Sequence, residues 1–341
     1  MKLSDYNYDL PKERIAQHPP KKRGDAKLLV LHKKDGKVED KKYVDVLDYL
    51  NPGDVVVLNN TKVIKARLEA VGSDGKKYEL LLNEKHGNSD DKHHHKAMYR
   101  GKLTEGMDLA IDKYNVRVLG VYEDGTALLE STIDFMEIAE SLGHVPLPHY
   151  MKREDTKEDE QRYQTEFAKK AGSVAAPTAS LNFTDELIEK LKAKGVEVCY
   201  LTLHVGLGTF MPIRTDDIKK HKMHSEWFSI PKDTTNKISK AKKQGNNVLA
   251  VGTTVARTLE YANEEIMNKP GTIQGEADIF IYSGYEFKVV DILLTNFHAP
   301  KSTVLMLAGA FSGWGNLLKA YEHAIKKEYN FLSYGDSMLI L

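Results

Sequence analysis

The stretch Ala176-Pro-Thr-Ala-Ser-Leu-Asn-Phe-Thr184, together with the segment that runs on to Leu203-His-Val-Gly-Leu-Gly-Thr-Phe210, decides the fold of this chain. Thr184 is a favourable helix N-cap, because its hydroxyl can accept an otherwise unpaired amide hydrogen. Apolar residues recur at helical spacing after it, and Gly195 ends the run. Residues 196–203 are rich in strand-forming side chains, which favours a buried strand. Two polar loops therefore flank one helix–strand unit, and such loops commonly carry ligand sites.

Composition limits the classes of protein to be considered. The 341 residues are enough for about two domains. Lys plus Arg and Asp plus Glu both number 49, so any basic surface must be local. The one cysteine, Cys199, cannot form an internal disulfide, which fits a reducing compartment. No apolar signal region or membrane-length apolar run is present, and we expect a soluble, cytoplasmic protein without membrane association.

The chain divides into two kinds of organisation. From about residue 63 to 149, short alternating runs are separated by turn sequences such as Ser73-Asp-Gly75 and Glu123-Asp-Gly125. Five or six short strands with little helix predict a small antiparallel β-barrel that closes its own edges. Elsewhere, strands and helices alternate, as in a sheet covered on both faces. The sequence therefore predicts an α/β sandwich domain from 1–62 and 150–341, with a barrel domain, 63–149, inserted in it.

Individual elements of the sandwich follow from periodicity and turn residues. The expected strands are 27–32, 55–58, 196–203, 248–251, 278–282, 288–294 and 338–341. The expected helices are 185–194, 233–243, 255–267, 303–311 and 316–328.

Two strand-to-helix turns have the character of anion sites. In Val251-Gly-Thr-Thr254, a strand enters a turn and a helix begins, so free amide hydrogens and the positive end of a helix dipole meet there. Arg257 then lies in the first turn, where a cation is unfavourable unless it binds an anion or extends into solvent. We favour a clamp on a carboxylate or phosphate, so Arg257→Ala should weaken binding without unfolding the protein. Lys301, just before the cap Ser302, repeats the pattern.

Histidines supply the candidate proton carriers. His204 begins a loop with two glycines, Gly206 and Gly208, but the third glycine of a dinucleotide fingerprint is absent. His221, His224 and Glu226 match no zinc-ligand spacing, so acid/base or hydrogen-bonding roles are favoured and no metal is predicted. The run His93-His-His95 is interpreted as a solvated loop between two barrel strands.

Local basic clusters offer a possible path for a phosphate backbone between barrel and sandwich. Each alone is usually a solvated face. They comprise Lys21-Lys-Arg23, Lys152-Arg153, Lys219 with Lys220 and Lys222, and Lys237 with Lys240, Lys242 and Lys243.

Many short blocks, in order along nearly the whole chain, resemble one enzyme family. They are Ile15-Ala-Gln-His-Pro19, Leu58-Asn-Asn-Thr-Lys-Val-Ile64, Arg162-Tyr-Gln-Thr165, Gly172-Ser-Val-Ala-Ala-Pro-Thr-Ala179, Thr202-Leu-His-Val-Gly-Leu-Gly-Thr-Phe210, His221-Lys-Met-His-Ser-Glu226, Val251-Gly-Thr-Thr254, Thr295-Asn-Phe-His298, Pro300-Lys-Ser302 and Tyr334-Gly-Asp336. The family is the S-adenosylmethionine:tRNA ribosyltransferase-isomerases of queuosine biosynthesis. Departures include Ser180 and Asn182, where the family usually has glycine and histidine.

The resemblance implies a bilobed monomer that moves the ribosyl part of S-adenosylmethionine to 7-aminomethyl-7-deazaguanine at the tRNA wobble position. The ribosyl group is isomerised to give epoxyqueuosine, and adenine and methionine are released. S-adenosylmethionine is a consumed cosubstrate, and no cofactor is implied. Its sulfonium acidifies the adjacent ribose carbon, so a base must remove a proton and an acid should assist the departure of adenine.

Roles for individual residues remain hypotheses at this point. The assigned proton carriers are His204, His224 and Glu226. The residues assigned to hold substrate are Thr178, Asn182, Thr184, Arg257, Asn296, His298, Lys301 and Ser302. If the histidine usual at position 182 carries a proton, asparagine cannot replace it, whereas a positioning role would survive. Two alternatives stay open: a catalytically impaired paralogue that binds RNA, and a histidine-dependent hydrolase of a small nucleotide.

Overall fold

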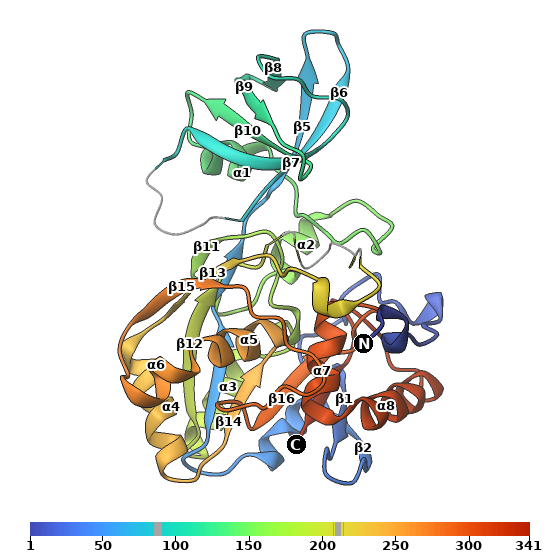
Figure 1. Ribbon diagram of the computed structural model, residues 1–341, viewed down its shortest axis with the longest axis vertical. Helices are drawn as coiled ribbons and strands as arrows, with labels where there is room; N and C mark the ends of the chain where they lie inside the picture. The colour runs from blue at the N-terminus through green and yellow to red at the C-terminus, as the bar shows by residue number, and fades with distance from the viewer. Residues whose placement is uncertain (85–90, 207, 209–212, 214) are drawn as a thin grey trace.

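A nine-stranded sheet forms the centre of the larger part of the molecule in the computed structural model, and a barrel stands beyond it (Figure 1). The structure describes residues 1–84, 91–206, 208, 213 and 215–341. The order in the sheet is β15-β13-β12-β3-β14-β16-β17-β1-β2. Its strands are β1 (Lys27–Leu31), β2 (Val38–Lys42), β3 (Val55–Asn59), β12 (Glu197–Leu203), β13 (Glu226–Ile230), β14 (Val248–Val251), β15 (Ile273–Ala277), β16 (Ile292–Asn296) and β17 (Ser337–Ile340).

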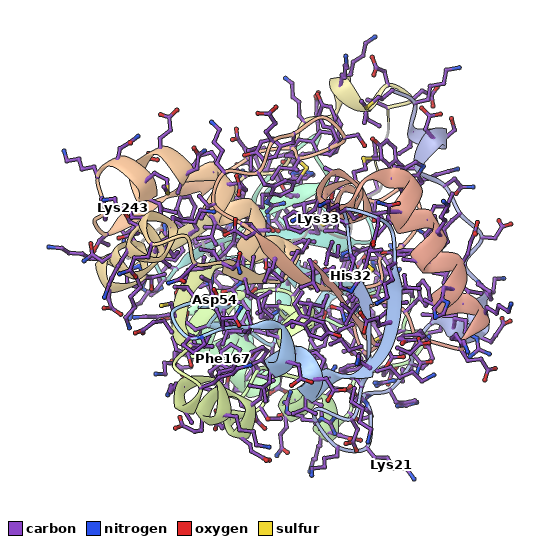
Figure 2. All side chains as sticks on the ribbon, turned by 90° about the horizontal axis from the view of Figure 1, so that it is seen from below. Lys21, His32, Lys33, Asp54, Phe167 and Lys243 are labelled. Atoms are coloured by element: carbon purple, nitrogen blue, oxygen red, sulfur yellow. The ribbon has the colours of Figure 1, made fainter. Side chains whose placement is uncertain are left out.

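Four adjacent strands in this sheet, β12, β3, β14 and β16, run parallel, and β17 pairs with β16 in the opposite direction. Their carboxyl ends therefore share one edge with the amino end of β17. β3 continues through β4 (Thr61–Val63) into the barrel, so this edge faces the barrel (Figure 1). Asp54, just before β3, marks the opposite edge, which Figure 2 views from below. Open α/β sheets bind ligands outside the carboxyl ends of their strands, so the edge toward the barrel is the expected site.

Helices cover both faces of the sheet, because its buried strands alternate their side chains between two cores. Val55 and Val57 pack into one core with residues of α4, α5, α6, α7 and α8. Val56 and Leu58 pack into the other with α3 and with residues 43–50. The predicted αβα sandwich is therefore confirmed. The helices are α3 (Asp185–Ala193), α4 (Lys232–Lys243), α5 (Thr253–Tyr261), α6 (Asn263–Asn268), α7 (Thr303–Ser312) and α8 (Trp314–Lys326).

The barrel is closed in the order β10-β7-β6-β5-β8-β9, with neighbouring strands antiparallel, as predicted. Both turn sequences at Asp-Gly join hairpins. Its strands are β5 (Arg67–Gly72), β6 (Lys77–Leu82), β7 (His94–Arg100), β8 (Asp108–Ile111), β9 (Tyr114–Val121) and β10 (Thr126–Ser131). The return to the sandwich passes α1 (Phe135–Leu142), α2 (Lys157–Arg162) and β11 (Lys170–Ser173), and β11 pairs with β4. The exact domain limits at 63 and 149 stay a prediction.

The structure corrects several expected elements. The strand expected at 278–282 is wrong, since the strand is β15, five residues earlier, where its residues pair with β13. The strand expected at 288–294 begins only at Ile292, because the amides of Val289 and Val290 bond the buried Glu260 carboxylate instead of a neighbouring strand. The single helix expected at 255–267 is two helices, α5 and α6, which meet at Ala262. His94 and His95 belong to β7 and not to a loop.

Candidate functional site

A pocket of about 150 Å³ lies at the carboxyl edge of the parallel strands. Many of the residues that line it lie at or just after the carboxyl ends of β12, β14 and β16, or precede β17. Among the predicted site residues, four line it: Thr178, Asn296, His298 and Ser302. We call it the nucleoside pocket, after the cosubstrate that the sequence resemblance implies. Its other lining residues are Tyr150, Tyr163, Ala175, Ala176, Pro177, Ala179, Val205, Gly252, Thr253, Thr254, Thr295, Phe297, Ala299, Val304, Leu332 and Ser333.

Two helices begin at this pocket. α5 starts after Gly252, which adopts φ +101° and offers no side-chain cap; a Cβ at this position would lie 3.6 Å from Ala179. Thr253 and Thr254 line the pocket in the uncapped first turn. α7 starts after Ser302, whose hydroxyl accepts the Leu305 amide, so the predicted cap is confirmed. Free amides and two positive dipole ends suit this wall to a carboxylate.

His298 contributes the one imidazole among the residues that line the pocket in the described part of the chain. Its Nε2 lies 2.9 Å from Thr295 Oγ1, its backbone amide donates to the Tyr321 hydroxyl, and its carbonyl accepts from the Tyr8 hydroxyl. Nδ1 makes no hydrogen bond with a described residue. Burial lowers the pKa of His298 to about 3, so the ring is neutral at physiological pH. A neutral ring here does not repel a cationic ligand.

Thr178 and Asn296 reach the pocket from opposite sequence segments and bond each other. The Thr178 hydroxyl donates to Asn296 Oδ1 at 2.8 Å, and the Asn296 amide nitrogen lies 3.4 Å from the Asp336 carbonyl. This pair ties the 3-10 turn Thr178–Ser180 to the end of β16. The two residues thus meet at one pocket, and their role toward substrate stays a prediction.

Six hydroxyl-bearing residues on the pocket wall are absent from the predicted set, and three of them, Tyr150, Tyr163 and Ser333, lie outside the helices and strands. The Tyr150 hydroxyl bonds Ser333 Oγ. Tyr163 is almost fully buried and ends α2. None of the three belongs to a periodic element, which is why their place in the site could not be predicted from a sequence pattern.

Asp159 in α2 fixes this wall. Its carboxylate accepts two hydrogen bonds from Arg153, one from Tyr334 at 2.8 Å, and two from Thr156. Burial opposes ionisation, but hydrogen bonds from Arg153, Tyr334 and Thr156 outweigh it and hold the pKa of Asp159 well below its usual range. The carboxylate is therefore ionised in the folded protein, and the wall depends on its charge.

Asp159→Asn is expected to lower the free energy of unfolding by about 3 kcal/mol, as for other broken buried ion pairs. Because the folded-state pKa is depressed, this contribution is fully present above the unfolded value of about 4 and is lost as pH falls below it. Urea unfolding at pH 7 and at acid pH measures both effects. The variant should lose less on acidification than the native protein, and an equal loss in both would contradict the assignment.

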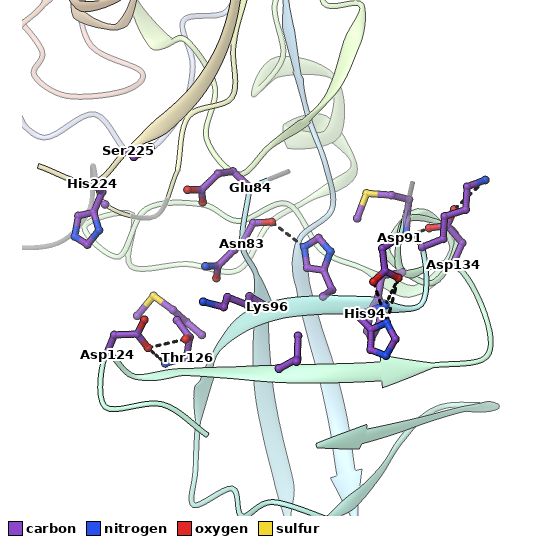
Figure 3. Close-up of a pocket in the computed structure, with 17 residues that line it drawn as sticks. Asn83, Glu84, Asp91, His94, Lys96, Asp124, Thr126, Asp134, His224 and Ser225 are labelled. Atoms are coloured by element: carbon purple, nitrogen blue, oxygen red, sulfur yellow. Dashed lines mark hydrogen bonds and ion pairs between the residues drawn. The ribbon is translucent and has the colours of Figure 1, made fainter. Parts of the chain in front are cut away.

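A second, wider cavity of about 650 Å³ lies between barrel and sandwich (Figure 3). The barrel contributes Asn83 and Glu84, just after β6, with residues of β7, β10 and α1, and the sandwich contributes Gly208, His224 and Ser225. Carboxylates from Glu84, Asp124 and Asp134 line it beside Lys96 and His94. Val205 lines the nucleoside pocket and Gly208 lines this cleft, so residues only three positions apart after β12 reach both cavities.

Known proteins with similar sequences cover the whole chain. The family model described as a queuosine biosynthesis protein matches residues 3–340. Relatives from Chlorobaculum parvum and Pelodictyon phaeoclathratiforme, both named S-adenosylmethionine:tRNA ribosyltransferase-isomerase, are 49% and 48% identical over 100% of both chains. The chain belongs to the queuosine biosynthesis protein family. A crystal structure of the S-adenosylmethionine tRNA ribosyltransferase of Thermotoga maritima superposes with a TM-score of 0.57 at 36% identity, over 99% of this chain and 100% of the other.

In this queuosine biosynthesis protein, the expected proton carriers lie outside the nucleoside pocket. His204 is buried, stacks on Trp227 at 5.1 Å, and its Nδ1 lies 2.8 Å from Thr61 Oγ1. Gly172 adopts φ +147° beside this ring, where a Cβ would lie 2.7 Å from Nε2. His224 lines the cleft instead, and a Cβ at Gly208 would lie 2.6 Å from its ring. Gly172 and Gly208 thus allow protein side chains to approach the backbone closely.

Arg257 has a protein partner that the sequence did not reveal. It is 6% exposed and forms an ion pair with Glu226, which is 2% exposed and also accepts the Gly206 amide at 2.8 Å. Burial lowers the pKa of Arg257 to about 10, so it stays charged at neutral pH. Arg257 lines a small pocket that adjoins the nucleoside pocket and shares Thr253, Thr254 and Val304 with it. Its clamp on a ligand anion stays a prediction.

Three other predicted ligand residues do not line either cavity. Thr184 caps α3 by accepting the Leu187 amide, as predicted. Asn182 is buried two residues earlier, where its carbonyl lies near Gly24. Lys301 is exposed, with φ +60°, and its amide donates to the Tyr6 carbonyl. Their proposed contacts with substrate therefore need a bound ligand that extends beyond the pocket.

The basic clusters divide between internal and surface roles. Arg23 donates to the carbonyls of Leu181, Gln161 and Gln164, and Arg153 is bound to Asp159. The cluster on α4 ends just before β14, at the edge of the sheet away from the barrel, and Lys242 pairs there with Asp291. These groups do not line the cleft. The path of basic residues expected from the sequence is thus wrong for Arg23, Arg153 and α4.

Two negative findings apply to the residues that the structure describes. Over those residues, no three acidic, histidine or cysteine side chains are grouped so that they could hold a metal ion. Within the same part of the chain, no helix has the length and apolar character needed to cross a membrane.

Proposed function

We propose that this chain transfers and isomerises the ribosyl group of S-adenosylmethionine onto 7-aminomethyl-7-deazaguanine in tRNA, forming epoxyqueuosine and releasing adenine and methionine. Membership of the family over residues 3–340 supports the reaction. One observation supports a location for this reaction: a single pocket has two helix N-termini on one side and a neutral histidine within it. Both cavities are built by one chain, in keeping with a monomer that acts in the cytoplasm.

S-adenosylmethionine is assigned to the nucleoside pocket. Its methionine carboxylate would lie against the amides of Thr253 and Thr254, where the dipole of α5 adds favourable charge. Thr178, Asn296 and Ser302 supply hydroxyl and amide groups for the ribose. His298 is assigned the removal of the proton from the ribose carbon next to the sulfonium, since its Nδ1 has no described protein partner. This assignment replaces His204 and Glu226, which do not line the nucleoside pocket.

The tRNA is assigned to the cleft between barrel and sandwich. The target base carries a primary amine that is a cation at neutral pH, and guanine-type bases present N–H donors on their pairing edge. Glu84, Asp124 and Asp134 are acceptors of the matching kind, and His224 and Lys96 lie with them (Figure 3).

One assay tests the function directly. The protein is incubated with S-adenosylmethionine and a tRNA that carries the aminomethyl base, and adenine, methionine and the mass of the anticodon nucleoside are measured. Adenine and methionine should appear in equal amounts with the modified nucleoside. Binding of the tRNA without release of adenine would identify the RNA-binding alternative, and release of adenine without tRNA would identify the hydrolase.

A further inference from the structure

The wall formed by Tyr150, Ser333 and Tyr163 has no part in the assignments above. The Tyr150 hydroxyl bonds Ser333, whereas the Tyr163 hydroxyl is approached by Ser333 and by the Ala176 backbone but makes no well-aligned hydrogen bond with a described residue. Tyr163 is 1% exposed and lines the nucleoside pocket. A buried hydroxyl without a well-formed hydrogen bond is costly, and native structures rarely keep one without a reason. A ligand in the pocket would supply a better-aligned acceptor.

These tyrosines are suited to donate hydrogen bonds and not protons. Burial raises the pKa of Tyr150 to about 12, and burial likewise raises the pKa of Tyr163. Both hydroxyls therefore keep their protons at every physiological pH. A neutral donor in a water-poor pocket stabilises charge that develops on a bound acceptor.

Tyr163 is also held rigidly in place. Its amide donates to the Asp159 carbonyl at 2.8 Å as the last turn of α2 ends. Its ring meets that of Tyr334 edge-to-face at 5.8 Å, and Tyr334 is in turn bonded to the Asp159 carboxylate. A donor fixed by such contacts does not have to reorganise when charge develops beside it.

The ends of the pocket differ in chemistry. Thr253, Thr254 and Val304 belong both to this pocket and to the small one that contains Arg257, so the helix starts lie toward that side. Tyr150, Tyr163 and Ser333 line only the nucleoside pocket, beside the apolar side chains of Ala176, Pro177 and Leu332. With the methionine carboxylate at the helix starts, the adenine ring falls toward the aromatic and apolar wall.

We propose that Tyr163, beside the Tyr150–Ser333 pair, holds the adenine of S-adenosylmethionine and donates a hydrogen bond to one of its ring nitrogens as the base departs. This inference rests on the proposed function. When the bond between C1′ and N9 breaks, its electron pair goes to adenine, and a lone pair of the ribose ring oxygen forms the new π bond to C1′. The proton that adenine gains on release is balanced by the one taken from the ribose carbon beside the sulfonium. Tyr163 keeps its own proton, so it is a hydrogen-bond donor to the leaving group.

The test combines Tyr163→Phe with S-adenosylmethionine analogues in which N3 or N7 of the adenine is replaced by carbon. With the natural cosubstrate, the variant should lose about 10²-fold in kcat, the usual cost of one such donor, with little change in KM. With the analogue that lacks the acceptor, native enzyme and variant should turn over at the same rate, because the interaction is already absent. If Tyr163→Phe reduced kcat by the same factor with the natural cosubstrate and with each of the two analogues, the proposal would be overturned.

A matched control separates the lost hydroxyl from lost stability. Tyr329 is equally buried, and its hydroxyl donates to Asp40 at 2.7 Å outside the pocket, so Tyr329→Phe should leave kcat unchanged. Retention of full kcat by Tyr163→Phe would also refute the donor role. Failure of the proposed function itself is distinct: the native protein would then release no adenine from the natural cosubstrate and the modified tRNA.

Discussion

His298→Asn is expected to reduce kcat for epoxyqueuosine formation by a factor of about 10² to 10⁴, the range for removal of a general acid or base. Asparagine fits the space of the imidazole and keeps the backbone bonds that hold the loop after β16, but its shorter amide does not reach Thr295 as Nε2 does. Release of adenine from S-adenosylmethionine and modified tRNA is the measurement. Since the asparagine side chain is shorter than imidazole and has no basic nitrogen, the affinity for the cosubstrate should change far less than kcat.

His323→Asn is a suitable control, because His323 of α8 lies beside Asp40 of β2 and does not line the nucleoside pocket. It should retain the native rate. If His298→Asn kept the native rate while His204→Asn or His224→Asn abolished it, the proton carriers assigned from the sequence would be restored. Calorimetric titration with S-adenosylmethionine adds a second readout, which would detect a role for His298 in binding alone.

Local signals explain what the sequence predicted well. Thr184 and Ser302 were predictable as N-caps, because a hydroxyl just before a helix can accept an unpaired amide hydrogen of the first turn. This interaction depends only on neighbouring residues. The sandwich and the barrel followed from the contrast between apolar strands with helices and short alternating strands with turns. Thr178 and Asn296 were assigned to one site through the family resemblance, and the structure places them within hydrogen-bond distance of each other.

Long-range contacts explain what the sequence could not predict. Tyr163 and Ser333 are brought to one pocket by α2 and by the approach to β17, and no spacing in the sequence relates them. Glu226 lies 31 positions before Arg257 and faces it only because β13 passes the start of α5. The position of Arg257 near the start of a helix therefore indicated that it needs an anionic partner, but it did not indicate that the partner is Glu226.

Arg257→Ala is expected to lower the free energy of unfolding by about 3–5 kcal/mol, because it leaves the Glu226 carboxylate buried without its cation. This reverses the sequence-based expectation that the variant would stay folded and lose affinity. Denaturant unfolding of the purified protein is the measurement. Lys237→Ala is the control: Lys237 pairs with Asp233 on the surface of α4, and its loss should cost about 0.5 kcal/mol or less.

The double variant Glu226→Gln with Arg257→Met separates a structural pair from a ligand clamp. Removing both charges relieves the uncompensated carboxylate, so the double variant should be more stable than Arg257→Ala, and glutamine can still accept the Gly206 amide. If the pair acts only in folding, S-adenosylmethionine will bind the double variant with native affinity. If Arg257 also attracts the methionine carboxylate through the adjoining pocket, stability will recover while affinity stays low. A buried carboxylate that loses its cation must cost stability. If Arg257→Ala kept the native stability but bound S-adenosylmethionine more weakly, the structural pair would be refuted and the clamp inferred from the sequence supported.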